Sequence, residues 1–239
     1  VKIRGLQMHI GSQLTSVSPF VEAVEKVLPL VEELKSLYGI EFFSIGGGIG
    51  IVYQDSLASG GSDWWIDKDE KPLTIEEYAA CLVPLLKPLG LRIILEPGRF
   101  MVGNAGVLLT EVLYEKRGTA KTFKIVDAAM NDLIRPSLYE AEHPIAPLRR
   151  PAAPPAEKPC DVVGPVCESS DFLGLARRLP PLAPDDLLAV FSAGAYGASM
   201  TSNYNSRRRP AEVMVVGEQV TLLRRRERFE DLWAAELDS

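Results

Sequence analysis

The sequence is poor in the residues that metal sites and disulfides need. Its 239 residues include two histidines, His9 and His143, and three cysteines, none of them in a CxxC pair. Two histidines exclude a histidine-rich metal site, and few, unpaired cysteines are typical of a reducing compartment. We therefore expect no metal and a cytoplasmic protein, with His143 as a loop residue.

The sequence also lacks a basic surplus and a long hydrophobic run. It has 26 Lys and Arg against 32 Asp and Glu, a net charge of −6, so no basic surface is expected to bind nucleic acid. Two arginine-rich stretches, 207–209 and 224–228, are interpreted as a solvated face or as ion pairs of a dimer. The longest uncharged apolar run, 187–200, is too short to span a bilayer, and no signal peptide is visible.

The first hundred residues alternate between strand and helix patterns. Strands are predicted at Ile3–Ile10, Glu41–Ile45 and Leu91–Leu95. Two helices are predicted between them: one from a Ser18 N-cap to a Gly39 C-cap, bent or split at Pro29, and one from a Thr74–Glu77 capping box to Gly90. Residues 54–72 read as a long loop. This alternation implies parallel strand pairing in an α/β sheet or barrel.

After residue 100 the pattern becomes mostly β, which predicts a domain boundary between residues 105 and 106. The strand candidates are Val107–Tyr114, Thr122–Ala128, Asp161–Val166, Leu187–Phe191 and Glu212–Leu223. The Pro- and Ala-rich segment 144–159 reads as a connecting loop. Residues 229–237 are a short helix candidate.

Unusual polar or glycine-rich sequence follows each of the three early strands. The motifs are HIGSQ at 9–13, GGGIG at 46–50 and EPGR at 96–99. Ligands bind at the carboxyl ends of parallel strands, and consecutive glycines let backbone N–H groups approach an anion. Ser12 and Arg99 can add donors, which makes a phosphate cradle. Ile51 breaks a GxGxxG pattern and no GK[ST] follows, so a single phosphoryl group fits better than a dinucleotide or ATP.

Each of these residues also has a structural interpretation. His9 could be a satisfied histidine at a strand end. The glycines could serve only the geometry of a strand-to-helix turn. Arg99 could pair with Glu96 across the Pro97-Gly98 turn instead of binding a ligand. The coincidence of three such motifs at three strand ends favours a site.

Three further motifs occupy the β region: VDAAMNDLIRPSLY at 126–139, GPVCESSD at 164–171 and GAYGASM at 194–200. All six motifs, in this order, resemble the diaminopimelate decarboxylase family of fold-type III pyridoxal-phosphate (PLP) enzymes, over essentially the whole chain. The resemblance implies the last strands of an alanine-racemase-like TIM (β/α) barrel in residues 1–105. An antiparallel β-barrel or sandwich domain with a short C-terminal helix would follow in 106–239.

The resemblance also implies roles for individual residues. The cofactor-binding residues would be His9, Ser12, Gly46, Gly47, Gly48, Glu96, Pro97, Gly98, Arg99 and Tyr196. The substrate-binding residues would be Arg99, Arg135, Tyr139, Glu168 and Tyr196. His9 would stack against the cofactor ring, and Glu96 would keep its pyridine nitrogen protonated. Cys167 would protonate the carbanion, although many cysteines are inert buried residues.

The residues around Cys167 favour one substrate. Diaminopimelate carries an amino-acid group at each end, so its distal end needs a cation and an anion; Arg135 and Glu168 offer them. Related ornithine-type decarboxylases have Asp after the cysteine and lack the AAMNDLIRPSLY stretch at 128–139. The alternatives are a decarboxylase of an ornithine, arginine or carboxynorspermidine type, a non-catalytic relative, and an ordinary interface ion pair for Arg135 and Glu168.

One family feature has no counterpart in this sequence. The family's cofactor lysine lies early in the barrel, and no lysine here has a matching context. A complete barrel alone takes about 250 residues, so we expect this chain to be a fragment that lacks the first barrel strands and the Schiff-base lysine, with doubtful activity by itself. The intact parent would convert meso-2,6-diaminopimelate to L-lysine as a homodimer with shared active sites.

Overall fold

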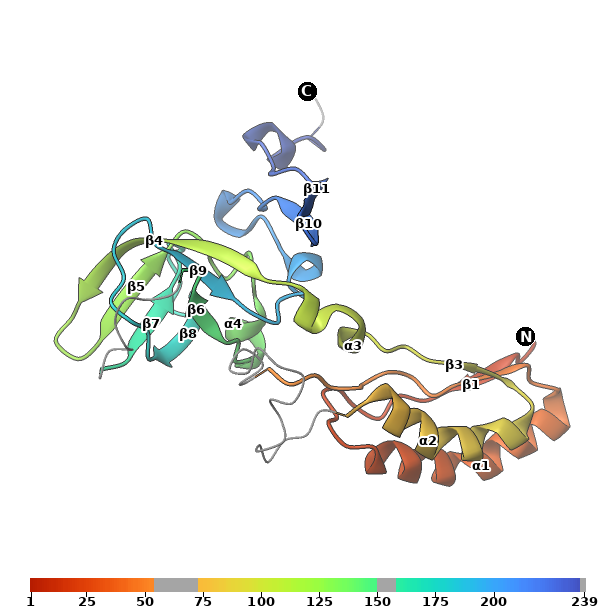
Figure 1. The fold of residues 1–239 in the computed structure, drawn as a ribbon. Helices are drawn as coiled ribbons and strands as arrows, with labels where there is room; N and C mark the ends of the chain where they lie inside the picture. Colours follow the sequence, from red (N-terminus) through yellow and green to blue (C-terminus); the bar gives the residue numbers. More distant parts are fainter. Residues whose placement is uncertain (54–72, 150–157, 237–239) are drawn as a thin grey trace. The chain divides into compact units, whose positions relative to one another are not determined.

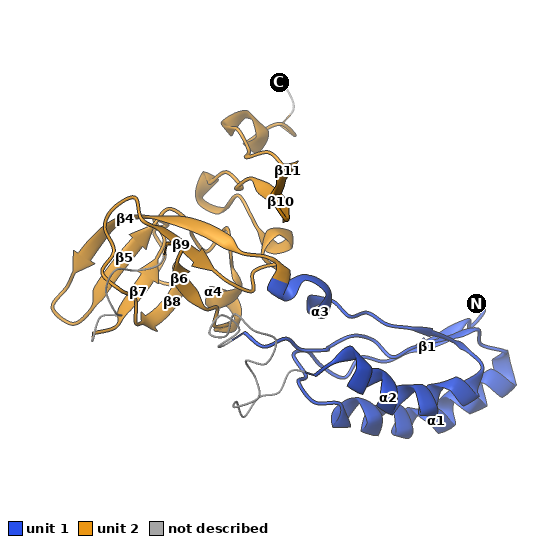
Figure 2. Ribbon diagram, viewed as in Figure 1, with its two compact units in different colours: residues 1–104 blue, residues 105–239 orange. Residues whose placement is uncertain are grey.

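The computed structural model describes residues 1–53, 73–149 and 158–236, and the predicted loop at 54–72 lies outside these ranges. The chain divides into two compact units, residues 1–104 and 105–239 (Figure 2). Within the described segments, no helix is long and apolar enough to cross a membrane.

Unit 1 is a parallel three-stranded sheet with helices between the strands (Figure 1). Its elements are β1 (Gly5–Gln7), α1 (Ser18–Tyr38), β2 (Phe42–Ser44), α2 (Ile75–Leu86), the 3-10 turn Lys87–Leu89, β3 (Arg92–Ile94), α3 (Arg99–Val102) and the 3-10 turn Gly103–Ala105. Strands β1 and β3 both pair in parallel with the central β2. The predicted parallel pairing is therefore confirmed, although the strands are shorter than expected.

The core of unit 1 lies between the sheet and its two long helices. Phe20 and Val24 of α1 and Leu82 of α2 are fully buried in one cluster with Phe43 of β2. Full burial of each such side chain stabilises the fold by about 1.5–3 kcal/mol. Tyr78 meets Phe20 edge to face with ring centroids 5.1 Å apart, and burial raises the pKa of its hydroxyl to about 12.

The predicted capping residues of the two long helices can be compared with the observed ones. Gly39 and Gly90 both adopt left-handed C-cap conformations, as predicted, and the Thr74 hydroxyl accepts a hydrogen bond from the Glu77 N–H. The prediction that Ser18 is the N-cap is wrong, because the helix begins at Ser18 and Val17 precedes it without a side-chain cap. Pro29 does not split α1; the buried apolar face of the helix offsets the cost of about 3 kcal/mol that an internal proline carries.

Unit 2 contains a six-stranded sheet in the order β6-β9-β4-β5-β7-β8. Its strands are β4 (Leu108–Arg117), β5 (Thr122–Val126), β6 (Ile145–Pro147), β7 (Cys160–Val163), β8 (Phe172–Arg177) and β9 (Leu187–Val190). Strands β5 and β7 pair in parallel, whereas the other neighbours are antiparallel. The prediction of an antiparallel β domain is therefore confirmed for four of the five strand pairs of this sheet and wrong for β5 with β7: the sheet is mixed, with β6 and β8 at its edges.

The remaining elements of unit 2 are short. They are α4 (Arg135–Tyr139), the 3-10 turns Ala198–Met200, Tyr204–Ser206 and Phe229–Leu232, and the hairpin of β10 (Glu212–Val216) and β11 (Gln219–Arg224). The predicted single strand 212–223 is wrong, because Gly217 takes a positive φ of 59° and turns the chain back. Strand β6 also lies within the segment predicted to be a connecting loop. The predicted C-terminal helix is a single 3-10 turn.

Candidate functional site

The three motifs of unit 1 lie side by side because their strands are neighbours in register. Gln7, Ser44 and Ile94 are aligned across the sheet. Backbone bonds continue the pairing beyond the strand ends, from Ile45 N–H to the Ile94 carbonyl at 3.1 Å and from Glu96 N–H to the Gly46 carbonyl at 2.8 Å. The carboxyl ends of all three strands therefore meet at one edge of unit 1.

Close approach of these strand ends requires glycine. A Cβ on Gly47 would lie 1.9 Å from the carbonyl oxygen of Glu96, and one on Gly46 would lie 2.3 Å from that of Met8. Gly46 and Gly48 also have positive φ angles of 75° and 104°, which strain any residue with a side chain. The geometric role of the glycines is thus present in the structure, and their phosphate-binding role stays a prediction.

His9 and Glu96 are both held by neighbours at this edge. The His9 Nδ1 accepts a hydrogen bond from the Gly47 N–H at 3.3 Å. The Ser44 hydroxyl donates to the Glu96 carboxylate at 2.7 Å and accepts from the Gly46 N–H at 3.3 Å. Sequence reasoning missed Ser44, whose signal was its place at a strand end two residues before a glycine run.

Arg99 lies at the start of α3, after the Pro97-Gly98 turn. Its guanidinium donates to the Ser12 hydroxyl at 2.8 Å and to the Tyr53 hydroxyl at 2.7 Å, and it lies 5.9 Å from the centre of the Tyr53 ring. Arg99 and Glu96 thus have different partners here, so the ion-pair interpretation of the turn does not describe this structure. Two strong donors for an anion, a hydroxyl and a guanidinium, are adjacent.

In unit 2, the candidate Arg135 begins helix α4 and is only 5% exposed. One guanidinium nitrogen lies 2.8 Å from the Nε2 of His143, and the other ring nitrogen of His143 lies 2.9 Å from the carbonyl oxygen of Phe191. His143 lies in the loop between α4 and β6, as predicted, and it is completely buried there. Tyr139, at the other end of α4, is exposed.

A buried aspartate, Asp171, holds the loop that carries Cys167 and Glu168 by accepting hydrogen bonds from the backbone. Cys167 and Glu168 are both exposed. The Asp171 carboxylate accepts hydrogen bonds from the Val166 N–H at 2.6 Å and from the Met130 N–H at 2.7 Å. Burial raises the pKa of Asp171, while the two N–H donors act in the opposite direction. Asp171 therefore shapes the loop and ties it to the segment that precedes α4.

A second contact joins α4 to the same loop. The Ser137 hydroxyl donates to the Ser170 carbonyl at 2.5 Å. Together with the bond from Met130 to Asp171, this contact holds the helix of Arg135 and Tyr139 beside the loop of Cys167 and Glu168. The structure thus brings together two of the motifs whose residues were predicted to bind substrate.

The third motif of unit 2 contains Tyr196, which is exposed and has an unusual positive φ of 62°. Such a backbone conformation costs about 1–3 kcal/mol in a residue other than glycine, and it occurs frequently at functional sites. The following Gly197 is required locally, because a Cβ there would lie 2.2 Å from the Ala193 carbonyl oxygen.

Tyr204 is a neighbour of the site that sequence reasoning missed. Its hydroxyl donates to the Glu168 carboxylate at 2.5 Å, and this carboxylate raises the pKa of Tyr204. The contact brings the 201–206 segment to the Cys167 loop. Its only sequence signal was proximity to the 194–200 motif.

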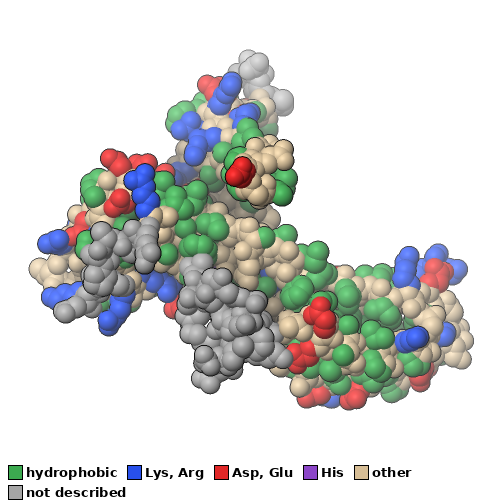
Figure 3. Space-filling view, viewed as in Figure 1, with side chains coloured by type: hydrophobic (Ala, Val, Ile, Leu, Met, Phe, Trp, Pro, Cys, Tyr) green, Lys and Arg blue, Asp and Glu red, His purple; other side chains and the backbone are tan. Residues whose placement is uncertain are grey.

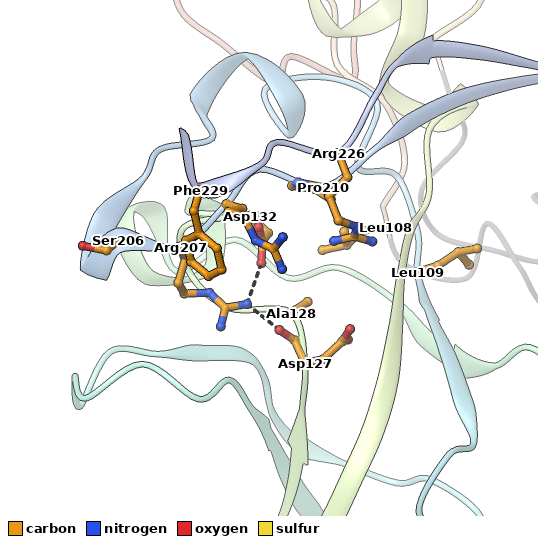
Figure 4. Close-up of a pocket in the computed structure, with 11 residues that line it drawn as sticks. Leu108, Leu109, Asp127, Ala128, Asp132, Ser206, Arg207, Pro210, Arg226 and Phe229 are labelled. Carbon is orange, nitrogen blue, oxygen red and sulfur yellow. Dashed lines mark hydrogen bonds and ion pairs between the residues drawn. The ribbon is translucent and has the colours of Figure 1, made fainter. Parts of the chain in front are cut away.

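In the lining of a pocket of about 380 Å³ in unit 2, Arg207 contacts Asp127 and Asp132 (Figure 4). Arg207 donates to the Asn131 side chain at 2.8 Å and to the Asp127 carbonyl at 2.5 Å, and lies 3.5 Å from the Asp132 carboxylate. Burial raises the pKa of Asp132. Arg207 therefore joins the 126–139 segment to the C-terminal part of the unit.

The arginine-rich stretches have acidic partners within this chain. Figure 3 shows Lys and Arg side chains grouped over the C-terminal part of the molecule. The pairs are Arg207 with Asp132, Arg209 with Glu227, Arg224 with Glu212 and Arg225 with Asp231. Ion pairs inside unit 2 thus involve four of these arginines, whose side chains remain partly exposed, so the solvated-face interpretation is compatible with the structure.

The family model of the C-terminal sheet domain of pyridoxal-dependent decarboxylases matches residues 19–194. The chain therefore belongs to this family of pyridoxal-dependent decarboxylases.

Its similar relatives are diaminopimelate decarboxylases. The chain is 48% identical to those of Neisseria meningitidis serogroup A and Vibrio cholerae, over 99% and 98% of its length. It covers 54% and 52% of those two proteins, so it spans about half the length of the curated relatives that it matches.

Solved structures agree with this assignment. The protein AQ1208 from Aquifex aeolicus superposes with a TM-score of 0.89 at 43% identity, over 100% of this chain and 56% of the other. The diaminopimelate decarboxylase of Helicobacter pylori complexed with L-lysine gives 0.83 at 42% identity, over 98% of this chain and 55% of the other.

Proposed function

We propose that this chain supplies the C-terminal part of a PLP-dependent decarboxylase that converts meso-2,6-diaminopimelate to L-lysine. The observation that carries the proposal is its 48% identity to diaminopimelate decarboxylases over nearly its whole length. The joined segments of α4 and the Cys167 loop support it, because they hold a cation and an anion suited to the distal amino-acid group of that substrate. The proposed location is the cytoplasm.

We propose that residues 1–105 form the last part of a PLP-binding (β/α) barrel and residues 106–239 a β domain. The parallel β1-β2-β3 sheet with its intervening helices supports the first assignment, because barrels repeat this strand–helix unit. Part of a barrel leaves strand edges without a pairing strand, and such edges can pair with other chains. We therefore expect activity only together with the portion of the relatives that this chain does not match. The active protein would be a homodimer.

The strand-end edge of unit 1 fits a PLP phosphate. The neighbouring donors of Ser12 and Arg99 provide positive and hydrogen-bonding groups. The three glycines, Gly46 to Gly48, present backbone without side chains, and the Pro97-Gly98 turn and Tyr196 are the other proposed contacts.

Two further residues at this edge would bind the cofactor ring. Glu96, oriented by Ser44, would bond the pyridine nitrogen, and His9, oriented by Gly47, would stack on the ring. PLP accepts the electrons left behind when carbon dioxide departs. The chain's own residues at this edge therefore bind and orient the cofactor.

The candidate groups of unit 2 would bind substrate and move a proton. Arg135, together with Arg99, would bind the distal carboxylate, Glu168 the distal ammonium, and Tyr139 and Tyr196 would add hydroxyl groups. The exposed Cys167 thiol would deliver the proton that replaces carbon dioxide. Asp171 would hold the loop that sets the position of this thiol.

A chimera tests the proposal. The part of the Neisseria meningitidis diaminopimelate decarboxylase that this chain does not match would be fused before residue 1, and carbon dioxide and L-lysine would be measured with a panel of amino acids. We expect turnover of meso-diaminopimelate, with ornithine and arginine far slower. Preference for ornithine, arginine or carboxynorspermidine would indicate a related decarboxylase. A folded, PLP-loaded chimera without any turnover would indicate a non-catalytic relative.

Substitution of two cysteines, one inside and one outside the proposed site, tests the role of Cys167. Cys167→Ser should lower kcat by about 100-fold, the lower end of the loss expected for removal of a general acid. Cys81→Ser, in α2 and outside the proposed site, should leave kcat unchanged. Equal effects of the two substitutions would refute the role of Cys167.

A further inference from the structure

His143 connects two distant parts of unit 2. It lies shortly before β6, whereas Phe191, which it contacts, directly follows β9. The Phe191 N–H donates to the carbonyl of Pro144 at 2.9 Å. The backbone on both sides of this imidazole is thus fixed by the pairing of β6 with β9.

The two contacts of the imidazole determine its tautomer. A guanidinium can only donate and a carbonyl oxygen can only accept. The Nε2, 2.8 Å from Arg135, must therefore accept, and the Nδ1, 2.9 Å from the Phe191 carbonyl, must carry the proton and donate. His143 is consequently a neutral imidazole with its proton on Nδ1.

We propose that His143 is a positioning residue that fixes the guanidinium of Arg135 for the carboxylate of an amino-acid substrate, which rests on the proposed function. Arginine side chains have many rotamers, and α4, which carries Arg135, is only five residues long. An acceptor anchored to the sheet removes this freedom before substrate binds. A neutral imidazole orients the guanidinium and adds no negative charge of its own.

The first test uses the 239-residue chain and needs no activity. With ¹⁵N-labelled histidine the chain gives two imidazole spectra, and His9→Gln assigns them. At neutral pH we expect Nδ1 of His143 to be protonated and Nε2 to be unprotonated. A cationic ring, or a proton on Nε2, would overturn the proposal.

The same chain with ¹⁵N-labelled arginine reports the position of Arg135. We expect slow rotation of its guanidinium, seen as separate signals of the terminal nitrogens, that is lost in His143→Leu and restored in His143→Gln. Glutamine retains one acceptor and one donor, whereas leucine retains neither. Unchanged rotation in folded His143→Leu would overturn the proposal; if that variant does not fold, slow rotation must still persist in His143→Gln.

Kinetics in the chimera test the link to substrate. His143→Leu should raise KM for meso-diaminopimelate by about tenfold, the effect of one misplaced charge-assisted hydrogen bond, with a smaller change in kcat, and His143→Gln should recover most of it. An unchanged KM in an active chimera would overturn the substrate part of the proposal. An inactive chimera would overturn the proposed function instead, and the arginine spectra would still decide whether His143 positions Arg135.

Discussion

Removal of the Asp171 carboxylate should loosen the Cys167 loop and destabilise unit 2. In Asp171→Ala the N–H groups of Val166 and Met130 lose acceptors that lie 2.6 and 2.7 Å away in the wild type. Each buried N–H without an acceptor costs about 1–3 kcal/mol. Because burial raises the pKa of Asp171, loss of the charge offsets part of this cost. We expect a net loss of about 3 kcal/mol in the free energy of unfolding.

Urea unfolding followed by circular dichroism measures this loss. With a denaturant slope of about 2 kcal/mol per molar, the urea midpoint should fall by about 1.5 M. The matched control is Asp186→Ala, which removes a single exposed bond, to the Ala183 N–H at 2.7 Å. That control should change stability by less than about 1 kcal/mol.

Hydrogen exchange locates the effect in the loop. The Val166 and Met130 amides should be protected in the wild type and lose protection in Asp171→Ala, and the exposed Cys167 thiol should change its rate of reaction with a disulfide reagent. Retained protection of both amides would refute the reasoning, whatever the change in overall stability.

Three other substitutions test separate parts of the fold. Glu115→Gln should cost about 2 kcal/mol at pH 7, because the nearly buried Lys124 loses its carboxylate. Lys124 and Arg117 lower the pKa of Glu115. The wild type should therefore lose this stability as the pH falls from the ordinary pKa of a glutamate through the lowered pKa of Glu115. A difference in unfolding free energy between the wild type and Glu115→Gln that stays constant down to acid pH would contradict this. Gly47→Ala should destabilise unit 1 by more than about 2 kcal/mol in thermal unfolding, since its Cβ would lie 1.9 Å from a backbone oxygen; a wild-type melting temperature would contradict the predicted clash. Tyr204→Phe should leave the midpoint of urea unfolding unchanged, because the bond that it removes is exposed; a clear fall in the midpoint would contradict this.

Local signals predicted unit 1 well. Gly39 and Gly90 end their helices because a left-handed residue there needs no Cβ, and this depends only on local geometry. The alternation of strand and helix likewise predicts parallel pairing, because no short turn can join parallel strands. Ser18 was misplaced by one position, since the serine and proline both lie inside the first helical turn.

Unit 2 was harder because its pairing is distant in sequence. Strand β8 contains Gly174 and lacks clear alternation, and its pairing with β7 determines its conformation. The parallel pairing of β5 with β7 left no local signal either.

Within the candidate site, motifs identified the segments, whereas the partners came only from the structure. Asp171 was visible as the last residue of the GPVCESSD motif, but its bond to Met130 joins segments far apart in the chain. Nor does the sequence near His143 show that Phe191 will lie beside it.

The pairing of β4 with β9 has a consequence during synthesis on the ribosome. Leu108 of β4 pairs with Val190 of β9, so one edge of β4 has no partner until the later segment has been made. At about 5–20 residues per second, that edge remains open for roughly 4–15 seconds after β4 is made. The β4–β5 hairpin can form at once, and the nascent chain then exposes a strand edge that can pair with a neighbouring chain. Slow translation through residues 118–190 should therefore lower the yield of correctly assembled unit 2.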